Sequence, residues 1–505
     1  MGSDDKKNAE FKNIKFGDSD ARTEMNYSPD LLIDGFLDEN GYIDKLIKDR
    51  FYLVYGLKGS GKTAIASRLK LISNDDPSLM VEQYSLERFN YSLFEGMGYN
   101  SSPESSSHKH SRKMPEVQNL KAWEIVLNTA LLTMFSQDPN LRSKDGSFVF
   151  NVINGLKKWG IIASSDFSMI VNKMSKNNII VDLKLLKFEH SSSTESTNAY
   201  DAAYDNLRNA IFDAVPSRKT LLVIDGIDSI VTEREVQNRV LSGLLHATSE
   251  INSSLRERGV NAKIILLCRK DLLDSLKDPN KQKIIGDFGF ELNWYDSGVD
   301  RDDINLIKLL NLRAKLSLDK DVNIFDDYLS PMVDRKKTYK FILDHTRHIP
   351  RDIVCLMNEI QKVYKNGDMN PSRYYNAVKT YSANYFYGEV QDELVGIMSD
   401  EEVQTIFKLI SENKKYRTSK RELEIKAQEL SLNLKNLNLE RSLSLLYDIG
   451  AIGNVRKVEG KDSYSFKYRD RWSSFNQTDE LVIHLALQKA LNVRGGYTNQ
   501  DVDYD

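Results

Sequence analysis

The sequence contains very little cysteine, and this restricts the kinds of protein that it can encode. Its 505 residues include only Cys268 and Cys355, and both stand among apolar neighbours. Two such cysteines argue against a disulfide framework and against a thiolate metal site, and they favour a reducing compartment. We therefore expect a cytoplasmic protein.

Long hydrophobic runs are absent as well. No apolar stretch approaches the length that a helix needs to cross a bilayer. The first residues, Met1–Lys6, contain neither the hydrophobic region of a signal peptide nor the Ser or Thr of a myristoylation motif. We expect no membrane partner.

The chain also has no large net charge. Its formal net charge is −3, so any contact with nucleic acid must come from a local basic patch. Hydrophobic residues make up 40% and charged residues 28%, which is ordinary for a globular protein. A chain of this length is expected to fold into about two to four domains.

Short apolar runs alternate with segments of helical spacing through the first 300 or so residues. Several of these runs end in a polar residue and precede a helix, as the central strands of a parallel sheet do. This alternation predicts an α/β fold with a doubly wound parallel sheet, whose ligand site lies at the carboxyl ends of the strands. The predicted strands are residues 51–55, 81–86, 221–224, 264–267 and 289–292.

A glycine-rich loop follows the first predicted strand and precedes a helix. Residues 56–63 read Gly-Leu-Lys-Gly-Ser-Gly-Lys-Thr. In this setting successive backbone N–H groups converge on phosphate oxygens at the positive end of the helix dipole. Lys62 can reach the β- and γ-phosphates and is also a catalytic candidate, and Thr63 can offer a hydroxyl to Mg²⁺. The loop predicts ATP with Mg²⁺, bound by Gly56, Gly59, Ser60, Gly61, Lys62, Thr63 and Ala64; a tight turn with a chance lysine is the alternative.

Carboxylates follow the strand predicted at residues 221–224. Asp225 directly ends that strand, and we expect it to hold the hydrated Mg²⁺ together with Thr63. Asp228 is a catalytic candidate that could orient and polarise the attacking water, because no acidic residue directly follows Asp225. Either aspartate could instead cap a helix.

Two arginines are candidates for contact with the phosphates of the nucleotide. Arg269 stands just after the strand at 264–267, with only Cys268 between them. There Arg269 could act as a catalytic residue whose guanidinium senses the γ-phosphate. A surface arginine in a charged turn is the alternative. Arg351 follows Pro350 at the start of a helix, and there it could bind the cofactor from a helical lid.

The last hundred residues have a different pattern. Three helices near 402–410, 420–430 and 437–448 precede two strands near 452–458 and 464–468, and Gly460 turns the hairpin. Three helices with a two-stranded ribbon predict a winged helix. Its basic residues could neutralise DNA phosphates, so we expect residues 400–492 to bind duplex DNA weakly, with a protein contact as the alternative. These basic residues are Lys414, Lys415, Arg417, Lys420, Arg421, Arg456, Lys457 and Lys461.

We accordingly expect five segments along the chain. They are a mobile leader (1–23), a P-loop ATPase core (24–298) with a helical insertion at about 100–215, a helical lid (299–392), a winged-helix domain (393–493) and an acidic tail (494–505).

At this point the chain resembles bacterial P-loop ATPases of the AAA+/STAND type that carry a C-terminal winged helix. The resemblance spans most of residues 16–492 and implies an AAA+-like fold, ATP with Mg²⁺ and assembly into a homo-oligomer through the nucleotide sites. Some relatives act in anti-phage defence or genome maintenance. Two features depart from the family pattern, since Gly226 rather than Glu follows Asp225 and no arginine finger stands between Arg269 and Phe290. The resemblance is carried by Tyr52–Thr63, Leu222–Asp228, Leu267–Arg269, Ile349–Ile353, Tyr468–Asp470 and Ile483–His484.

Three functions remain open from the sequence. The first is a molecular switch that binds and slowly hydrolyses ATP and couples the nucleotide state to a winged-helix partner module. The second is an origin-recognition-like DNA-binding ATPase that uses nucleotide mainly as a structural clamp. The third is a nucleotide-gated scaffold whose winged helix binds a protein partner.

Overall fold

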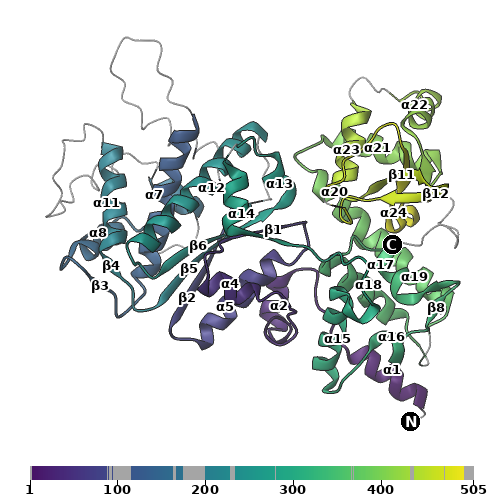
Figure 1. The fold of residues 1–505 in the computed structure, drawn as a ribbon, viewed down its shortest axis with the longest axis horizontal. Helices are drawn as coiled ribbons and strands as arrows, with labels where there is room; N and C mark the ends of the chain where they lie inside the picture. Colours follow the sequence, from purple (N-terminus) through teal and green to yellow (C-terminus); the bar gives the residue numbers. More distant parts are fainter. Residues whose placement is uncertain are drawn as a thin grey trace. The chain divides into compact units, whose positions relative to one another are not determined.

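A computed structural model describes most of the chain, which divides into two units (Figure 1). The sheet unit comprises residues 38–58 and 62–292, and the helical unit comprises residues 1–37, 59–61 and 293–505. The predicted acidic tail, much of the predicted insertion and Asp228 lie outside the described residues. The structure describes residues 3–87, 115–162, 167–174, 199–227, 234–278, 280–365, 369–432, 437–470 and 472–493, with Phe89, Phe94 and Gly367.

A five-stranded parallel sheet forms the centre of the sheet unit. Its strand order is β2-β5-β6-β1-β7, and each neighbouring pair runs parallel. The predicted α/β fold is confirmed, and each predicted apolar run lies in a strand or overlaps one. The observed strands are β1 (Leu53–Gly56), β2 (Leu79–Ser85), β5 (Lys219–Asp225), β6 (Ala262–Arg269) and β7 (Gly289–Leu292).

Helices cover both faces of this sheet (Figure 1). Helix α5 (Lys62–Asp75) packs on β2 and β5, while α7 (Pro115–Phe135) and α12 (Arg234–Glu257) pack together over β5 and β6. Trp123 of α7 is fully buried, and its indole Nε1 donates to the Val240 carbonyl of α12 at 2.8 Å. The other elements of this unit are α4 (Tyr42–Lys48), β3 (Arg142–Ser143), α8 (Phe148–Lys158), α9 (Phe167–Met174), α11 (Ala199–Asp213), β4 (Ala214–Val215), α13 (Lys270–Ser275) and α14 (Lys281–Phe288).

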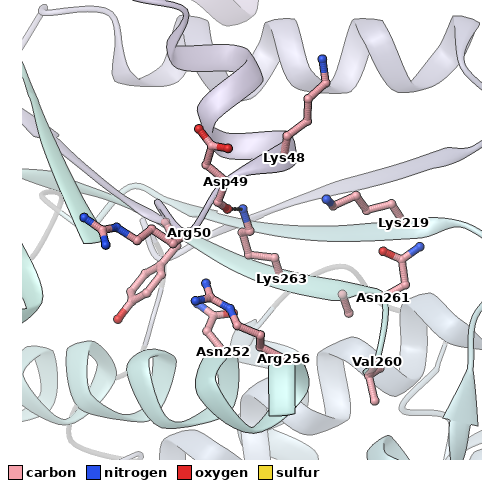
Figure 2. Close-up of a pocket in the computed structure, with 11 residues that line it drawn as sticks. Lys48, Asp49, Arg50, Lys219, Asn252, Arg256, Val260, Asn261 and Lys263 are labelled. Carbon is pink, nitrogen blue, oxygen red and sulfur yellow. Dashed lines mark hydrogen bonds between the residues drawn. The ribbon is translucent and has the colours of Figure 1, made fainter. Parts of the chain in front are cut away.

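The amino ends of the central strands border a solvent-open cavity of about 270 Å³ (Figure 2). Lys219 stands at the start of β5 and Lys263 near the start of β6, so this cavity lies at the edge of the sheet opposite the carboxyl ends of the strands.

The predicted mobile leader is wrong for the residues that the structure describes. Residues 3–13 form helix α1 (Ser3–Asn13), and Phe11 is fully buried in the core of the helical unit. Glu24 of α2 (Ala21–Tyr27) pairs with Arg313 at 2.9 Å, and both side chains are buried. The sequence suggested a leader because this segment is highly charged, but Phe11, Ile14 and Phe16 are all buried.

A helical bundle follows the sheet and begins the main part of the helical unit. Helix α18 starts at Pro350, a residue whose fixed φ and missing N–H suit the first turn of a helix. The bundle contains η1 (Arg301–Asp303), α15 (Asn305–Leu318), α16 (Ile324–Asp327), β8 (Met332–Val333), β9 (Lys336–Lys337), α17 (Thr338–Asp344), α18 (Pro350–Val363), α19 (Pro371–Tyr381), the π-helical η2 (Ser382–Phe386) and α20 (Tyr387–Leu394); α3 (Asp30–Ile33) precedes it in the chain.

The C-terminal residues have the order of elements of a winged helix. Capping boxes start its first two helices, with Ser399 and Glu402 at one and Ser419 and Glu422 at the other. The wing turns at Glu459 and Gly460, which both have positive φ. Its elements are α21 (Asp400–Asn413), β10 (Arg417–Thr418), α22 (Lys420–Glu429), α23 (Leu439–Asp448), β11 (Ile452–Val458), β12 (Lys461–Ser465), β13 (Glu480–Ile483) and α24 (Leu485–Ala490), with antiparallel strand order β10-β13-β11-β12.

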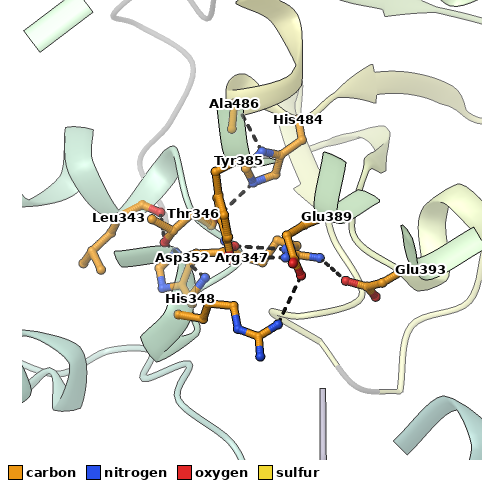
Figure 3. A network of polar contacts seen from close by, with 11 residues as sticks. Leu343, Thr346, Arg347, His348, Asp352, Tyr385, Glu389, Glu393, His484 and Ala486 are labelled. Carbon is orange, nitrogen blue, oxygen red and sulfur yellow. Dashed lines mark hydrogen bonds and ion pairs between the residues drawn. The ribbon is translucent and has the colours of Figure 1, made fainter. Parts of the chain in front are cut away.

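The bundle and the winged helix share one hydrophobic core, and a buried network of charges lies in the bundle. Figure 3 shows Arg347 at its centre. The Arg347 guanidinium donates to both carboxylate oxygens of Asp352 at 3.0 Å and also pairs with Glu393. His484, just before α24, contacts the Thr346 carbonyl through Nε2 at 3.2 Å. The two parts therefore form one packed body.

We predict that Arg347→Met destabilises the chain, because Asp352 and Glu393 would keep buried charges without their cation. Removing one partner of a buried ion pair costs about 3–5 kcal/mol in the free energy of unfolding. Arg301→Met is the matched control, since the Arg301–Asp326 pair is largely exposed, and it should cost no more than about 1 kcal/mol. Urea unfolding followed by circular dichroism measures both; equal losses would contradict the prediction.

Candidate functional site

The glycine-rich loop connects the end of β1 to the start of α5. Gly59 and Gly61 have φ angles of 81° and 100°, which L side chains rarely adopt. A Cβ at Gly59 would come within 3.0 Å of the Arg351 and Ile349 side chains. The sequence therefore needs glycine at both positions to form this turn.

Lys62 begins helix α5 and is almost fully buried. Its Nζ donates to the carbonyls of Gly56 at 3.2 Å and Leu57 at 2.8 Å, so the ammonium is folded back over the loop. Ser60 Oγ is buried and has no hydrogen-bond partner among the described residues. Ala64, which was also predicted to bind the nucleotide, lies in the first turn of α5.

Hydrogen bonds from described neighbours hold Asp225 at the carboxyl end of β5. Its Oδ2 accepts from Thr63 Oγ1 at 2.9 Å and from Gln83 Nε2 at 3.1 Å. Its Oδ1 accepts from the backbone N–H of Gly226 at 2.8 Å. The two residues predicted to hold Mg²⁺ are thus in direct contact, although they are 162 positions apart in the chain.

Glu87 lies beside the same end of β5. The register pairs Ser85 of β2 with Asp225, and Glu87 follows two residues after the end of β2. Gly226 has a φ of 74°, and a Cβ there would come within 2.9 Å of both Glu87 Cγ and Ser85 Oγ. The glycine that replaces the expected glutamate therefore makes room for residues from the neighbouring strand.

Arg269 ends β6 and is largely buried, so it is not a surface arginine. Its Nε and Nη2 donate to the two carboxylate oxygens of Asp271 at 2.9 and 2.8 Å. Burial alone would raise the pKa of Asp271, but the charges of Arg269 and then Lys62 hold this pKa below its ordinary value. Asp271 thus keeps a negative charge near the cations of the loop.

Residues 59–61 of the loop belong to the helical unit and accept hydrogen bonds from Trp294 and Arg351 of that unit. The Trp294 indole Nε1 donates to the Ser60 carbonyl at 2.8 Å, and the Arg351 backbone N–H donates to the Gly59 carbonyl at 3.4 Å. The guanidinium of Arg351 pairs with Glu389 of α20 at 3.2 Å. The start of the helix predicted to carry Arg351 therefore contacts Gly59, a residue of the same unit.

The structure brings Thr63 and Asp225 together and leaves Asp228 outside the described residues. The sequence reasoning missed Gln83 and Glu87. The apolar run at 81–86 could have pointed to both residues. A strand that runs parallel beside the one ending in Asp225 must end at the same, carboxyl edge of the sheet.

The residues present fit a nucleoside triphosphate with Mg²⁺. The loop supplies backbone N–H groups at the start of a helix, and a methyl group on Gly61 would meet no atom within 4 Å. Thr63 and Asp225 supply hard oxygen ligands of the kind that Mg²⁺ prefers. A parallel sheet with this loop between β1 and α5 is the fold of a P-loop NTPase.

Four of the eight cations of the predicted basic stripe on the winged helix are already paired with carboxylates. Arg417 pairs with Asp462 and Glu480, and Arg456 pairs with Asp479. Lys415 and Lys420 also pair with acidic residues. Lys457 and Lys461, at the end of the wing, are exposed and form no ion pair with a described residue. The patch that remains for phosphates is smaller than the sequence suggested.

Comparisons with known proteins give one match to a family and distant matches to whole chains. A family described as the FunZ-associated C-terminal helical domain matches residues 304–387. A protein of Escherichia coli (strain K12) named "Putative transposon gamma-delta 80.3 kDa protein" is 20% identical over 519 residues, which cover 96% of this chain and 68% of that protein.

Two solved structures are similar at low identity. Cdc6p from Pyrobaculum aerophilum is 12% identical with a TM-score of 0.32, and the match covers 95% of this chain and 98% of that chain. The Walker-type ATPase paby2304 of Pyrococcus abyssi is 10% identical with a TM-score of 0.36, covering 86% and 95%. Among the described residues, no helix is long and apolar enough to span a membrane.

Proposed function

We propose that this chain is an ATP-dependent molecular switch that binds ATP with Mg²⁺ at the glycine-rich loop and hydrolyses it slowly. The contact between Thr63 and Asp225, 2.9 Å long, carries the proposal, because a hydroxyl and a carboxylate side by side supply the oxygen ligands with which a P-loop holds Mg²⁺. When bound, Mg²⁺ would neutralise charge on the β- and γ-phosphates. Lys62 would turn from the loop carbonyls to these phosphates.

Hydrolysis also requires a group that orients the attacking water. Asp228 was predicted for this role, and Glu87 is a second candidate since it lies next to Gly226. A carboxylate accepts the proton of the water as the bond from the water oxygen to the γ-phosphorus forms and the bond to the β–γ bridging oxygen breaks, which releases ADP. Arg269 is fixed by Asp271, so we propose that it stabilises charge near the phosphate without moving.

The contacts of Trp294 and Arg351 with the loop support a coupling between nucleotide and partner. A nucleotide that reorders Gly59 and Ser60 would change the hydrogen bonds that their carbonyls accept from Arg351 and Trp294. Because the bundle and the winged helix share one core, both would respond together. Roles in anti-phage defence, a protein partner and a homo-oligomer stay predictions from the resemblance.

Lys62→Ala should weaken ATP binding by about a hundredfold, because two charge-assisted contacts to phosphate are worth about 3 kcal/mol. Titration calorimetry with ATP and Mg²⁺ measures the affinity. Lys58→Ala, which removes the same charge four positions earlier in the loop, is the matched control and should bind nearly as tightly as the wild type. An unchanged affinity of Lys62→Ala would rule out the proposed site.

Asp228→Asn should keep the affinity for ATP and lower kcat by about a hundredfold, because an amide still binds water but accepts its proton poorly. Steady-state phosphate release measures kcat. Glu87→Gln is the comparison from the neighbouring strand. A larger loss in Glu87→Gln assigns the water to Glu87 and leaves Asp228 as a helix cap, and wild-type rates in both variants contradict carboxylate assistance.

The second candidate function is weak binding of duplex DNA through the wing, and the unpaired Lys457 and Lys461 favour it. The two lysines stand on either side of the turn at Glu459 and Gly460, where both can approach adjacent phosphates. The surrounding pairs of Arg417 and Arg456 limit the affinity, because their carboxylates repel a phosphate.

We expect Lys457→Ala with Lys461→Ala to reduce the slope of log affinity against log salt by about two. Arg456→Ala should change this slope much less, since Asp479 already neutralises the guanidinium. Fluorescence anisotropy with a labelled duplex at several salt concentrations measures the slope. The full chain is required because the winged helix shares its core with the bundle. Absence of binding at low salt would favour the protein-scaffold function.

A further inference from the structure

The cavity at the amino ends of the strands concentrates positive charge in a chain whose net charge is negative. Its lining comes from the end of α4, from the end of α12 and from the starts of β5 and β6. One lining residue, Asp49, is acidic. The basic residues that line it are Lys48, Arg50, Lys219, Arg256 and Lys263.

Two of these cations have a structural role. Lys263 Nζ donates to the carbonyls of Leu46 and Asp49 and so caps the end of α4, where a cation is favourable to the helix dipole. Lys48 pairs with Asp44 of the same helix at 3.0 Å. Local structure therefore explains Lys48 and Lys263, and the guanidinium of Arg50 lies over the Phe51 ring at 5.7 Å, which leaves Lys219 and Arg256.

Lys219 and Arg256 have no such explanation. Neither side chain forms a hydrogen bond or an ion pair with any residue that the structure describes. Figure 2 shows Lys219 extending toward Lys263, with Arg256 on the other side. Burial, followed by repulsion from Lys219 and Arg256, lowers the pKa of Lys263 to about 8, and burial also lowers the pKa of Lys219. The positive charges of Lys219, Arg256 and Lys263 thus lie close together and repel one another. A bound anion would offset this repulsion.

We propose that this cavity is a second anion site, which binds a phosphate group between Lys219 and Arg256. The guanidinium of Arg256 offers paired donors to phosphate oxygens, and Lys219 adds a mobile ammonium. A phosphate of a free polyphosphate or a phosphate of a nucleic-acid backbone fits this chemistry. The site is separate from the glycine-rich loop, because β5 runs for seven residues, about 20 Å, between Lys219 and Asp225.

The experiment uses the full chain in a Lys62→Ala background, so that phosphate binding at the loop is suppressed. Titration calorimetry measures the affinity for inorganic pyrophosphate, which represents a free polyphosphate. Fluorescence anisotropy measures the affinity for a single-stranded oligonucleotide without terminal phosphates, which represents a nucleic-acid backbone. Lys219→Ala with Arg256→Ala should weaken one of these ligands by about tenfold or more. Lys157→Ala with Lys158→Ala, a change of equal charge at two exposed lysines of α8, is the control and should have little effect.

If Lys219→Ala with Arg256→Ala weakens the binding of pyrophosphate, the phosphate comes from a free polyphosphate. If the double variant weakens the binding of the oligonucleotide, the phosphate comes from a nucleic-acid backbone. If neither ligand binds, or if the two double variants lose affinity equally, the proposal is overturned. Circular dichroism checks folding. If the double variant does not fold, the exposed single change Arg256→Ala takes its place, with Lys157→Ala as its control. Both comparisons share the Lys62→Ala background, so they remain informative if ATP does not bind at the loop.

Discussion

The hydrogen bond between Thr63 and Asp225 is the constraint on which the candidate site depends. It joins the first turn of α5 to the end of β5, across the strand β6 that separates β1 from β5. Gln83 and the Gly226 N–H fix the remaining freedom of the carboxylate. A carboxylate that is held in this way keeps its oxygens in place before any ion arrives, and such preorganisation lowers the cost of binding a metal ion.

A second constraint acts on the helical unit. Arg347, Asp352 and Glu393 form a buried set of charges within the bundle, and the buried pair of Asp344 with Arg469, at 3.1 Å, joins the bundle to the winged helix. A charge left alone in this interior would be costly, so the two parts are not expected to separate in a normal working cycle. Movement of the winged helix would therefore require movement of the whole helical unit.

The two basic regions of this chain differ in whether their cations are paired with carboxylates. On the winged helix, Arg417 and Arg456 are neutralised by carboxylates, which makes them part of the fold. At the amino edge of the sheet, Lys219 and Arg256 are left without a countercharge among the described residues. Counting basic residues in the sequence favours the winged helix, whereas the structure directs attention to the edge of the sheet, because only spatial neighbours decide whether a cation is free for an external anion.

The sequence by itself determined the parallel sheet, the loop at residues 56–63 and the winged-helix pattern, since strand and helix periods and glycine positions are local properties of the chain. It did not determine that Phe11 would anchor the first helix in the core, because burial depends on a surface supplied about 300 residues later. Nor did it assign Gln83, Glu87 or Asp271 to the site. Only the tertiary structure decided these contacts, since the register of β2 against β5 and the pairing of Arg269 with Asp271 exist only once the side chains share a folded interior.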